Sequence, residues 1–216
     1  MKRVAMILSG SGYLDGTEIT EAVSLMIELS RHGAQVEFFA PDEMKPATNH
    51  LDKSITTDNR SVLAESARIS RSSITALDSL VAKDFDALVL PGGFGAATVL
   101  CDWASKGAAC SVLPLVSKSI QDFYKLQKPI GACCIAPVLL AKTLGSHKVQ
   151  LTIGNDPETN QEIRKTGAHP IDCPVDDFVT DRDHRVITTP AYMYDAKPHE
   201  VFLGISKMVS ELIEMA

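Results

Sequence analysis

Residues 129–137 form a short apolar run with two adjacent cysteines, Cys133 and Cys134. The run predicts a buried strand that turns sharply into a helix, because Pro137 suits a first helical turn and residues 138–141 stay apolar. Cys134 would then lie at the helix N-terminus, where unpaired N–H groups favour a nucleophilic thiolate. A free cysteine that only packs is the common alternative. Cys133, its neighbour on the strand, is expected to point the other way and pack.

A glycine-rich loop, residues 10–16, follows the first predicted strand and opens a helix. It does not fit a dinucleotide site, because Asp15 takes the place of the third glycine, and no Lys-Ser/Thr follows to make a P-loop. We expect Asp15 to cap the helix and Glu18 to complete a capping box. Glu21, one turn further, can face the crevice at the carboxyl edge of the sheet, or it can lie on a solvated face.

The third feature is Gly92-Gly93, in the loop that ends another hydrophobic strand. Two glycines allow backbone N–H groups to approach a ligand closely, as the stabilisation of an oxyanion requires. A tight turn alone would also use this pair. Because all three loops follow strands of one predicted sheet, we expect them to meet at the same edge.

Composition narrows the classes of function. The 216 residues carry a net charge of −6 with pI near 5.5 and no basic block, which argues against nucleic acid and anionic membrane surfaces as partners. The five cysteines are an odd number without C-x-x-C spacing, so neither a disulfide framework nor a metal site is predicted. A reducing compartment, the cytoplasm, fits this usage. The longest apolar run is too short to span a membrane.

Short β-type runs alternate with helical patterns along the chain, which predicts one α/β domain over residues 1–216 with a mostly parallel sheet and helices on both faces. The connection over residues 41–59 is long and polar. Besides the strand that begins the run 129–137, the predicted strands are residues 3–8, 35–40, 84–90, 149–153, 178–180 and 186–189. The predicted helices are residues 16–32, 61–69, 74–82, 112–126, 157–165 and 197–215.

Several of these motifs resemble the class I glutamine-amidotransferase-like superfamily, and within it the group of the Parkinson-disease deglycase, PfpI and glyoxalase III. The resemblance rests on the Pro-Gly-Gly turn, on Cys134 followed by Ala136-Pro137, and on Glu21 twelve residues ahead of Gly33. More narrowly, most of the chain resembles the ElbB family of isoprenoid-biosynthesis-associated proteins with an amidotransferase-like domain. The segments that carry this likeness are residues 8–10, 15–19, 65–69, 91–97, 134–137, 151–154 and 188–193.

The resemblance implies a three-layer, doubly wound (flavodoxin-like) fold and a homodimer. It also implies glutathione-independent glyoxalase activity on small 2-oxoaldehydes such as methylglyoxal and glyoxal, with no cofactor and no metal. Cys134 would be the nucleophile and Glu21 the acid/base partner. The N–H groups near Gly93 and Ile135 would hold the oxyanion. The remaining candidates for binding the substrate are Gly92, Glu18 and Gly12.

Two departures from the family pattern limit this expectation. Ile135 stands where protease-like members have a histidine, and Gly154 stands where the deglycase has another, so proteolysis and glutamine amidotransfer are not expected. His169 and His184 read as surface loop residues. Without a histidine, Glu21 alone carries the proton transfers, which implies slow turnover. The alternative is a redox sensor or partner-binding regulator, linked to isoprenoid metabolism or stress, in which Cys134 is oxidised without turnover.

Overall fold

The computed structural model describes residues 1–216 and contains eleven strands and eight α-helices. The strands are β1 (Arg3–Ile7), β2 (Gln35–Ala40), β3 (Met44–Thr48), β4 (Ile55–Ser61), β5 (Ile74–Ala76), β6 (Ala87–Leu90), β7 (Ile130–Cys133), β8 (Gln150–Leu151), β9 (His169–Pro170), β10 (Val179–Asp181) and β11 (Val186–Thr189). The helices are α1 (Ile19–Arg31), α2 (Val62–Ile69), α3 (Phe94–Thr98), α4 (Trp103–Lys106), α5 (Pro114–Lys125), α6 (Pro137–Leu144), α7 (Pro157–Lys165) and α8 (Pro198–Met215).

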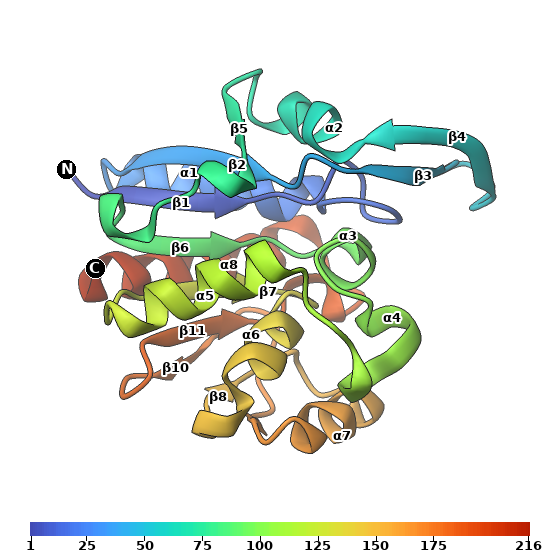
Figure 1. The fold of residues 1–216 in the computed structure, drawn as a ribbon. Coiled ribbons are helices and arrows are strands. Elements are labelled where there is room, and N and C mark those ends of the chain that lie inside the picture. Colours follow the sequence, from blue (N-terminus) through green and yellow to red (C-terminus); the bar gives the residue numbers. More distant parts are fainter.

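Seven strands form the central sheet in the order β10-β11-β7-β6-β1-β2-β5. All neighbours pair in parallel except β10, which runs antiparallel to β11. The parallel strands therefore end at one edge, on the right of Figure 1, while both chain termini lie on the left. Chain segments that leave these strand ends meet on that right-hand side, which is where doubly wound sheets bind ligands.

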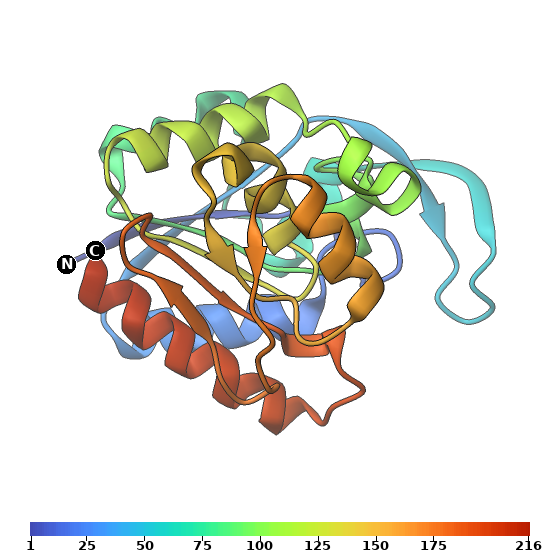
Figure 2. The same ribbon diagram turned by 90° about the horizontal axis from the view of Figure 1, so that it is seen from below.

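Helices cover both faces of the sheet, as the view from below shows (Figure 2). On one face lie α5 and α6, and on the other α1 and α8 pack side by side. Strands β1, β6 and β7 are buried along almost their whole length, which explains why they read as continuous apolar runs in the sequence. The predicted α/β fold, a doubly wound and mostly parallel flavodoxin-like sheet in three layers, is confirmed.

Two predicted elements are wrong in detail, and the long connection over residues 41–59 holds two strands that were not predicted. Residues 74–82, predicted helical, instead form β5 followed by a 3₁₀ turn, because Ile74 and Thr75 add a parallel pair to the outer edge of β2. The long connection after β2 holds the hairpin β3–β4, which projects away from the sheet at the upper right of Figure 1. The predicted strand 149–153 shrinks to β8, which pairs only with β9 outside the central sheet.

No helix is both long enough and apolar enough to cross a bilayer. The five cysteines are all free and all buried. No group of three or more His, Cys, Asp or Glu side chains is arranged to hold a metal ion.

Candidate active site

Cys134 lies at a sharp corner between β7, which ends at Cys133, and α6, which begins at Pro137. Its φ of 59° is in the left-handed region, which non-glycine residues seldom occupy. The corner is fixed from outside, since the Cys134 N–H donates to the carbonyl of Thr189 at 3.0 Å. Backbone strain held in place by neighbouring structure is a common property of functional residues, and strand–turn–helix corners of this kind present nucleophiles.

Glu21, in the first turn of α1, is fully buried, so the solvated alternative for this residue is wrong. Its Oε2 accepts a hydrogen bond from the Gly92 N–H at 2.9 Å, and its Oε1 accepts one from the Tyr192 N–H at 3.4 Å. The Cys134 side chain lies close enough to this carboxyl group to lower its pKa. Both predicted catalytic side chains therefore meet at the carboxyl edge of the sheet.

Burial raises the pKa of Glu21 to about 7, with a further contribution from the negative charge of Glu18. Hydrogen bonds from Cys134, Gly92 and Tyr192 act in the opposite direction and do not cancel the effect of burial. A carboxyl group with a pKa near 7 exists in both protonation states at neutral pH. Glu21 is therefore suited to take up and return a proton during a reaction.

The expected thiolate at Cys134 is not supported by its surroundings. Burial raises the pKa of the Cys134 thiol well above its usual value, and the neighbouring Glu21 carboxylate raises it further. The N–H groups of Gly93 and Ile135 hydrogen-bond to the sulfur and lower the pKa, but by less. The sequence predicted a thiolate from the nearby helix terminus, since α6 begins three residues after Cys134. It did not show that Cys134 is only 7 % exposed, and this burial has the larger effect on the pKa of the thiol. The resting site holds a neutral thiol that needs a base.

The paired glycines fit closely between the other parts of the site. A Cβ at Gly92 would come within 2.4 Å of the Cys134 Cβ and 2.7 Å of Glu21 Oε2. Gly93 has a φ of 92°, and a Cβ there would come within 2.4 Å of both the Glu18 nitrogen and the Gly16 oxygen. Only glycine can therefore bring this backbone against the thiol.

A Gly92→Ala substitution is expected to lower the free energy of unfolding by about 1–3 kcal/mol, because the methyl group overpacks a filled site. The new methyl group would also displace Cys134, whose Cβ lies against it, and so change the rate at which iodoacetamide alkylates the thiol. Gly33→Ala is the control for the alkylation rate, because no atom lies within 4 Å of its new methyl group and it lies outside the pocket. Its φ of 68° means that alanine costs stability there too, through backbone strain and not through packing. Urea unfolding of Gly92→Ala measures the loss of stability, and thiol alkylation is compared between the two variants. An alkylation rate in Gly92→Ala equal to that in Gly33→Ala would contradict the predicted close packing against Cys134.

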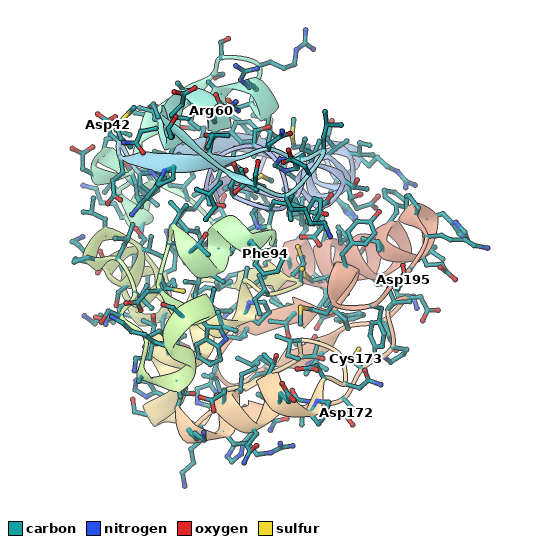
Figure 3. The ribbon with its side chains drawn as sticks, turned by 90° about the vertical axis from the view of Figure 1, so that its right-hand side faces the viewer. Asp42, Arg60, Phe94, Asp172, Cys173 and Asp195 are labelled. Atoms are coloured by element: carbon teal, nitrogen blue, oxygen red, sulfur yellow. The ribbon has the colours of Figure 1, made fainter.

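The thiol opens into a pocket of about 380 Å³ at the carboxyl edge. Phe94 lies near the centre of this face of the molecule in Figure 3. The pocket is lined by Tyr13, Glu18, Gly93, Phe94, Cys134, Ile135, Thr159, Tyr192 and Met193. Of the predicted binding residues, Glu18, Gly93 and Ile135 therefore line the pocket, while Gly92 lies between Glu21 and the thiol.

Gly12 does not line the pocket. A Cβ on Gly12 would instead meet the ring of His50 at 2.6 Å, on the hairpin side of the loop. That histidine packs edge-on against Tyr13, with ring centroids 5.6 Å apart. Through this contact the hairpin supports one wall of the pocket.

The predicted capping arrangement at the start of α1 is also wrong. Glu18 itself is the N-cap, and its Oε2 accepts the Glu21 N–H at 2.6 Å. Asp15 instead accepts the Thr48 N–H at 2.5 Å, which attaches the loop to β3. The helix consequently begins at Ile19, and its first turn places Glu21 directly beneath the pocket.

Cys133 is fully buried, as predicted, but its thiol does not point away from the site. Its Sγ donates to Glu21 Oε2 at 3.6 Å, so both cysteine side chains lie beside the same carboxyl group. The left-handed backbone at Cys134 breaks the alternation of a regular strand, which explains the departure.

The two histidines considered as substitutes lie elsewhere. His184 is held by Asp181 at 2.8 Å, stacks on Tyr124 and does not line the pocket. His169 is exposed on β9. Five further residues line the pocket that the sequence did not predict: Tyr13, Phe94, Thr159, Tyr192 and Met193. Four of these lie in segments already singled out as motifs, whereas Thr159 on α7 carried no signal.

The sequence agrees with this geometry. Residues 2–195 match the model of the DJ-1/PfpI family. The chain belongs to the DJ-1/PfpI family. Other DJ-1/PfpI-type structures share the fold at low identity, such as Schizosaccharomyces pombe DJ-1 with a TM-score of 0.57 and 22% identity over 99% of this chain and 92% of that one.

Some relatives of this DJ-1/PfpI protein are much more similar. The crystal structure of an isoprenoid biosynthesis protein with amidotransferase-like domain from Ehrlichia chaffeensis superposes with a TM-score of 0.94, at 36% identity over 100% of this chain and 99% of that one. The chain is 40% identical to the rat "ES1 protein homolog, mitochondrial", covering 99% of this chain and 84% of the rat protein. It is 41% identical to the human "Glutamine amidotransferase-like class 1 domain-containing protein 3, mitochondrial", covering 99% and 83%. The narrower resemblance to the ElbB type is confirmed.

Proposed function

We propose that this protein converts a 2-oxoaldehyde to a 2-hydroxy acid without glutathione, with Cys134 as the nucleophile. The observation that carries the proposal is the position of Cys134 and Glu21 side by side against Gly92, with Glu21 a buried carboxyl group whose pKa is raised to about 7. A neutral thiol beside such a carboxyl group can attack a carbonyl if its proton passes to the carboxylate. The N–H groups of Gly93 and Ile135 lower the pKa of this thiol, and N–H groups this near the sulfur can stabilise an oxyanion that forms beside it.

The first step joins the thiol to the substrate. The sulfur of Cys134 bonds to the aldehyde carbon, the C=O bond opens to an oxyanion, and the thiol proton passes to Glu21. The oxyanion is held by the N–H groups and then receives this proton, which gives a hemithioacetal and leaves Glu21 ionised. Removal of water from the buried site strengthens these hydrogen bonds.

The second step moves hydrogen between the two carbons. Ionised Glu21 removes the proton from the former aldehyde carbon, the electron pair forms a double bond to the neighbouring ketone carbon, and the ketone oxygen takes the negative charge of an enediolate. Glu21 returns a proton to that second carbon, and the hydroxyl proton on the first carbon passes to the oxygen of the second. This leaves a carbonyl group beside the sulfur, which is a thioester of the 2-hydroxy acid. One carbon is oxidised and the other is reduced, so no external redox partner is needed. Water then cleaves the thioester and restores the thiol.

The direct test is an NMR assay of methylglyoxal in D₂O without glutathione. We expect lactate that carries deuterium at its second carbon, because the proton held by Glu21 exchanges with solvent between its removal and its return. Absence of lactate above the level with heat-denatured protein would overturn the proposal. Lactate without deuterium at that carbon would indicate a direct hydride shift between the two carbons in place of the proton transfer through Glu21.

The pH dependence of the same assay is the second expected result. Because Glu21 must be ionised to accept the thiol proton, kcat/KM is expected to rise with pH through about 7 and then level off. Rates measured from pH 5.5 to 8.5 in buffers of constant ionic strength check this. A rate that does not change across that range would show that no group of this pKa takes part.

The sensor alternative is less well supported by the site. Oxidation-sensing cysteines are accessible and have a low pKa, whereas Cys134 is 7 % exposed and the pKa of its thiol is raised by burial. The alternative predicts modification of Cys134 by hydrogen peroxide at micromolar levels with no turnover. Mass spectrometry of the peptide after peroxide treatment distinguishes the two functions.

The homodimer and the reducing, cytoplasmic location are also proposals. Ile19, Val23 and Ile27 recur four residues apart along α1 and are 48%, 40% and 46% exposed, an apolar stripe that a second copy would cover. Sedimentation of the wild type and of Val23→Asp tests this, since a dimer built on the stripe would dissociate in the variant. Five free buried thiols support a reducing compartment, whereas the rat and human relatives are named as mitochondrial.

A further inference from the structure

The pocket above Cys134 is large and mostly apolar for a substrate as small as methylglyoxal. Its volume is about 380 Å³, within the range of pockets that bury most of a drug-sized ligand. Aromatic and aliphatic side chains make most of its wall: Tyr13, Phe94, Ile135, Tyr192 and Met193. A methyl group would leave most of this wall in contact with water.

A second hollow of about 620 Å³ continues from this pocket and shares Phe94, Ile135 and Thr159 with it. Trp103 and Ala97 add further apolar surface there. The two hollows adjoin at these three residues, and we call them together the groove. The second hollow lies between α4 and α7. A substituent on the substrate therefore has room to extend away from Cys134.

The groove carries negative charge and no positive charge. Neither hollow is lined by any Lys, Arg or His, whereas Glu18 lines the first and Glu158 and Glu162 line the second. The negative charge of Glu162 is partly compensated by a salt bridge to Lys165 and by a hydrogen bond from the Ala108 N–H. Glu18 caps α1 in the half-buried wall beside the thiol, and it has no cationic partner.

We infer that the substrates of this site are 2-oxoaldehydes with an uncharged aromatic or branched apolar substituent, and that anionic 2-oxoaldehydes are excluded. This inference rests on the proposed function and names its substrate class. Apolar contact with the groove stabilises the bound state, because it removes hydrocarbon surface on both sides from water. A carboxylate or phosphate on the substrate would meet Glu18 with no cation nearby to compensate the repulsion.

The first experiment compares initial rates for phenylglyoxal and methylglyoxal. We expect kcat/KM to be about tenfold or more higher for phenylglyoxal, since even one methylene group in an apolar pocket is worth about tenfold. Phe94→Ala is expected to reduce this preference several-fold. Leu126→Ala is the matched control, since Leu126 is a similarly exposed apolar residue, 48% against 52%, outside the groove. Equal kcat/KM for the two substrates would overturn the inference while the proposed function stands.

The second experiment isolates charge. It compares 4-carboxyphenylglyoxal with 4-carbamoylphenylglyoxal, which has nearly the same shape without the negative charge. We expect kcat/KM to be about tenfold lower for the carboxylate, and Glu18→Gln to narrow this ratio. Because the ratio is taken within each variant, a general loss of activity from the altered helix cap cancels. An unchanged ratio in Glu18→Gln, or equal rates in the wild type, would contradict the assigned role of Glu18.

A third measurement does not depend on turnover. The unreactive ketones 4-acetylbenzamide and 4-acetylbenzoate compete with iodoacetamide for access to Cys134. Protection by the amide at concentrations where the acid gives none supports the inference even if no 2-oxoaldehyde is converted, in which case only the proposed function fails. Equal protection by both ketones, or none by either, overturns the inference.

Discussion

Replacement of Cys134 by serine is expected to lower kcat/KM for 2-oxoaldehydes by at least about 10³-fold. A hydroxyl group ionises far less readily than a thiol, and Glu21, with its pKa raised to about 7, is too weak a base to activate it. The thioester step is lost as well, since an ester forms in its place. The assay that measures lactate from methylglyoxal detects the loss directly.

The matched control is Cys133→Ser. It changes the neighbouring residue in the same way and keeps a hydrogen-bond donor for Glu21 Oε2, which the Cys133 thiol approaches at 3.6 Å. Cys133 does not line the pocket, so we expect its turnover to fall by less than about tenfold. If Cys134→Ser kept more than a tenth of the wild-type activity, or if Cys133→Ser lost as much, Cys134 would not be the nucleophile.

The regular elements of the fold were predictable because their sequence patterns agree with their final environment. The segment 35–40 forms β2 and the segment 157–165 forms α7, both with the predicted bounds. The order of helices and strands then implied a parallel sheet, and the common edge for Cys134, Glu21 and Gly93 followed from that topology alone. The helix predicted over residues 74–82 was wrong because the local sequence pattern favours a helix, whereas pairing with β2 is a long-range contact that a local pattern does not contain.

The electrostatics of the site were not predictable from the sequence. The helix terminus after Cys134 suggested a stabilised thiolate, but the protonation of this residue depends on how completely the loops close over it. Burial and the Glu21 carboxylate both raise the pKa of the thiol, and neither is visible in the spacing of residues. The pocket walls show the same limit, because Thr159 comes from α7, which no motif connected with the site.

Glu21→Gln is expected to lower kcat/KM by about 10²–10⁴-fold, the usual contribution of a general acid–base group. Glutamine keeps an oxygen that can accept the Gly92 N–H, but it can neither take nor return a proton. The thiol responds in the opposite direction. Because the Glu21 carboxylate raises the pKa of Cys134, its removal is expected to speed alkylation by iodoacetamide at pH 8. Slower alkylation together with lost turnover would mean that the substitution had only disordered the site.

The same variant is expected to be more stable than the wild type at pH 8. Folding raises the pKa of Glu21 from 4.5 to about 7, so ionisation of this buried carboxyl group destabilises the folded state by about 3 kcal/mol above pH 7. Below about pH 4.5 the group is protonated in both the folded and unfolded states, and the difference between variant and wild type should vanish. Urea unfolding at pH 4.5, 6 and 8 measures this. We expect the stability advantage of Glu21→Gln, which is its free energy of unfolding minus that of the wild type, to grow with pH. An advantage that did not change with pH would come from packing and not from charge. An advantage that grows with pH, in a variant that has lost turnover, would show that the fold bears the cost of a carboxylate that the chemistry requires.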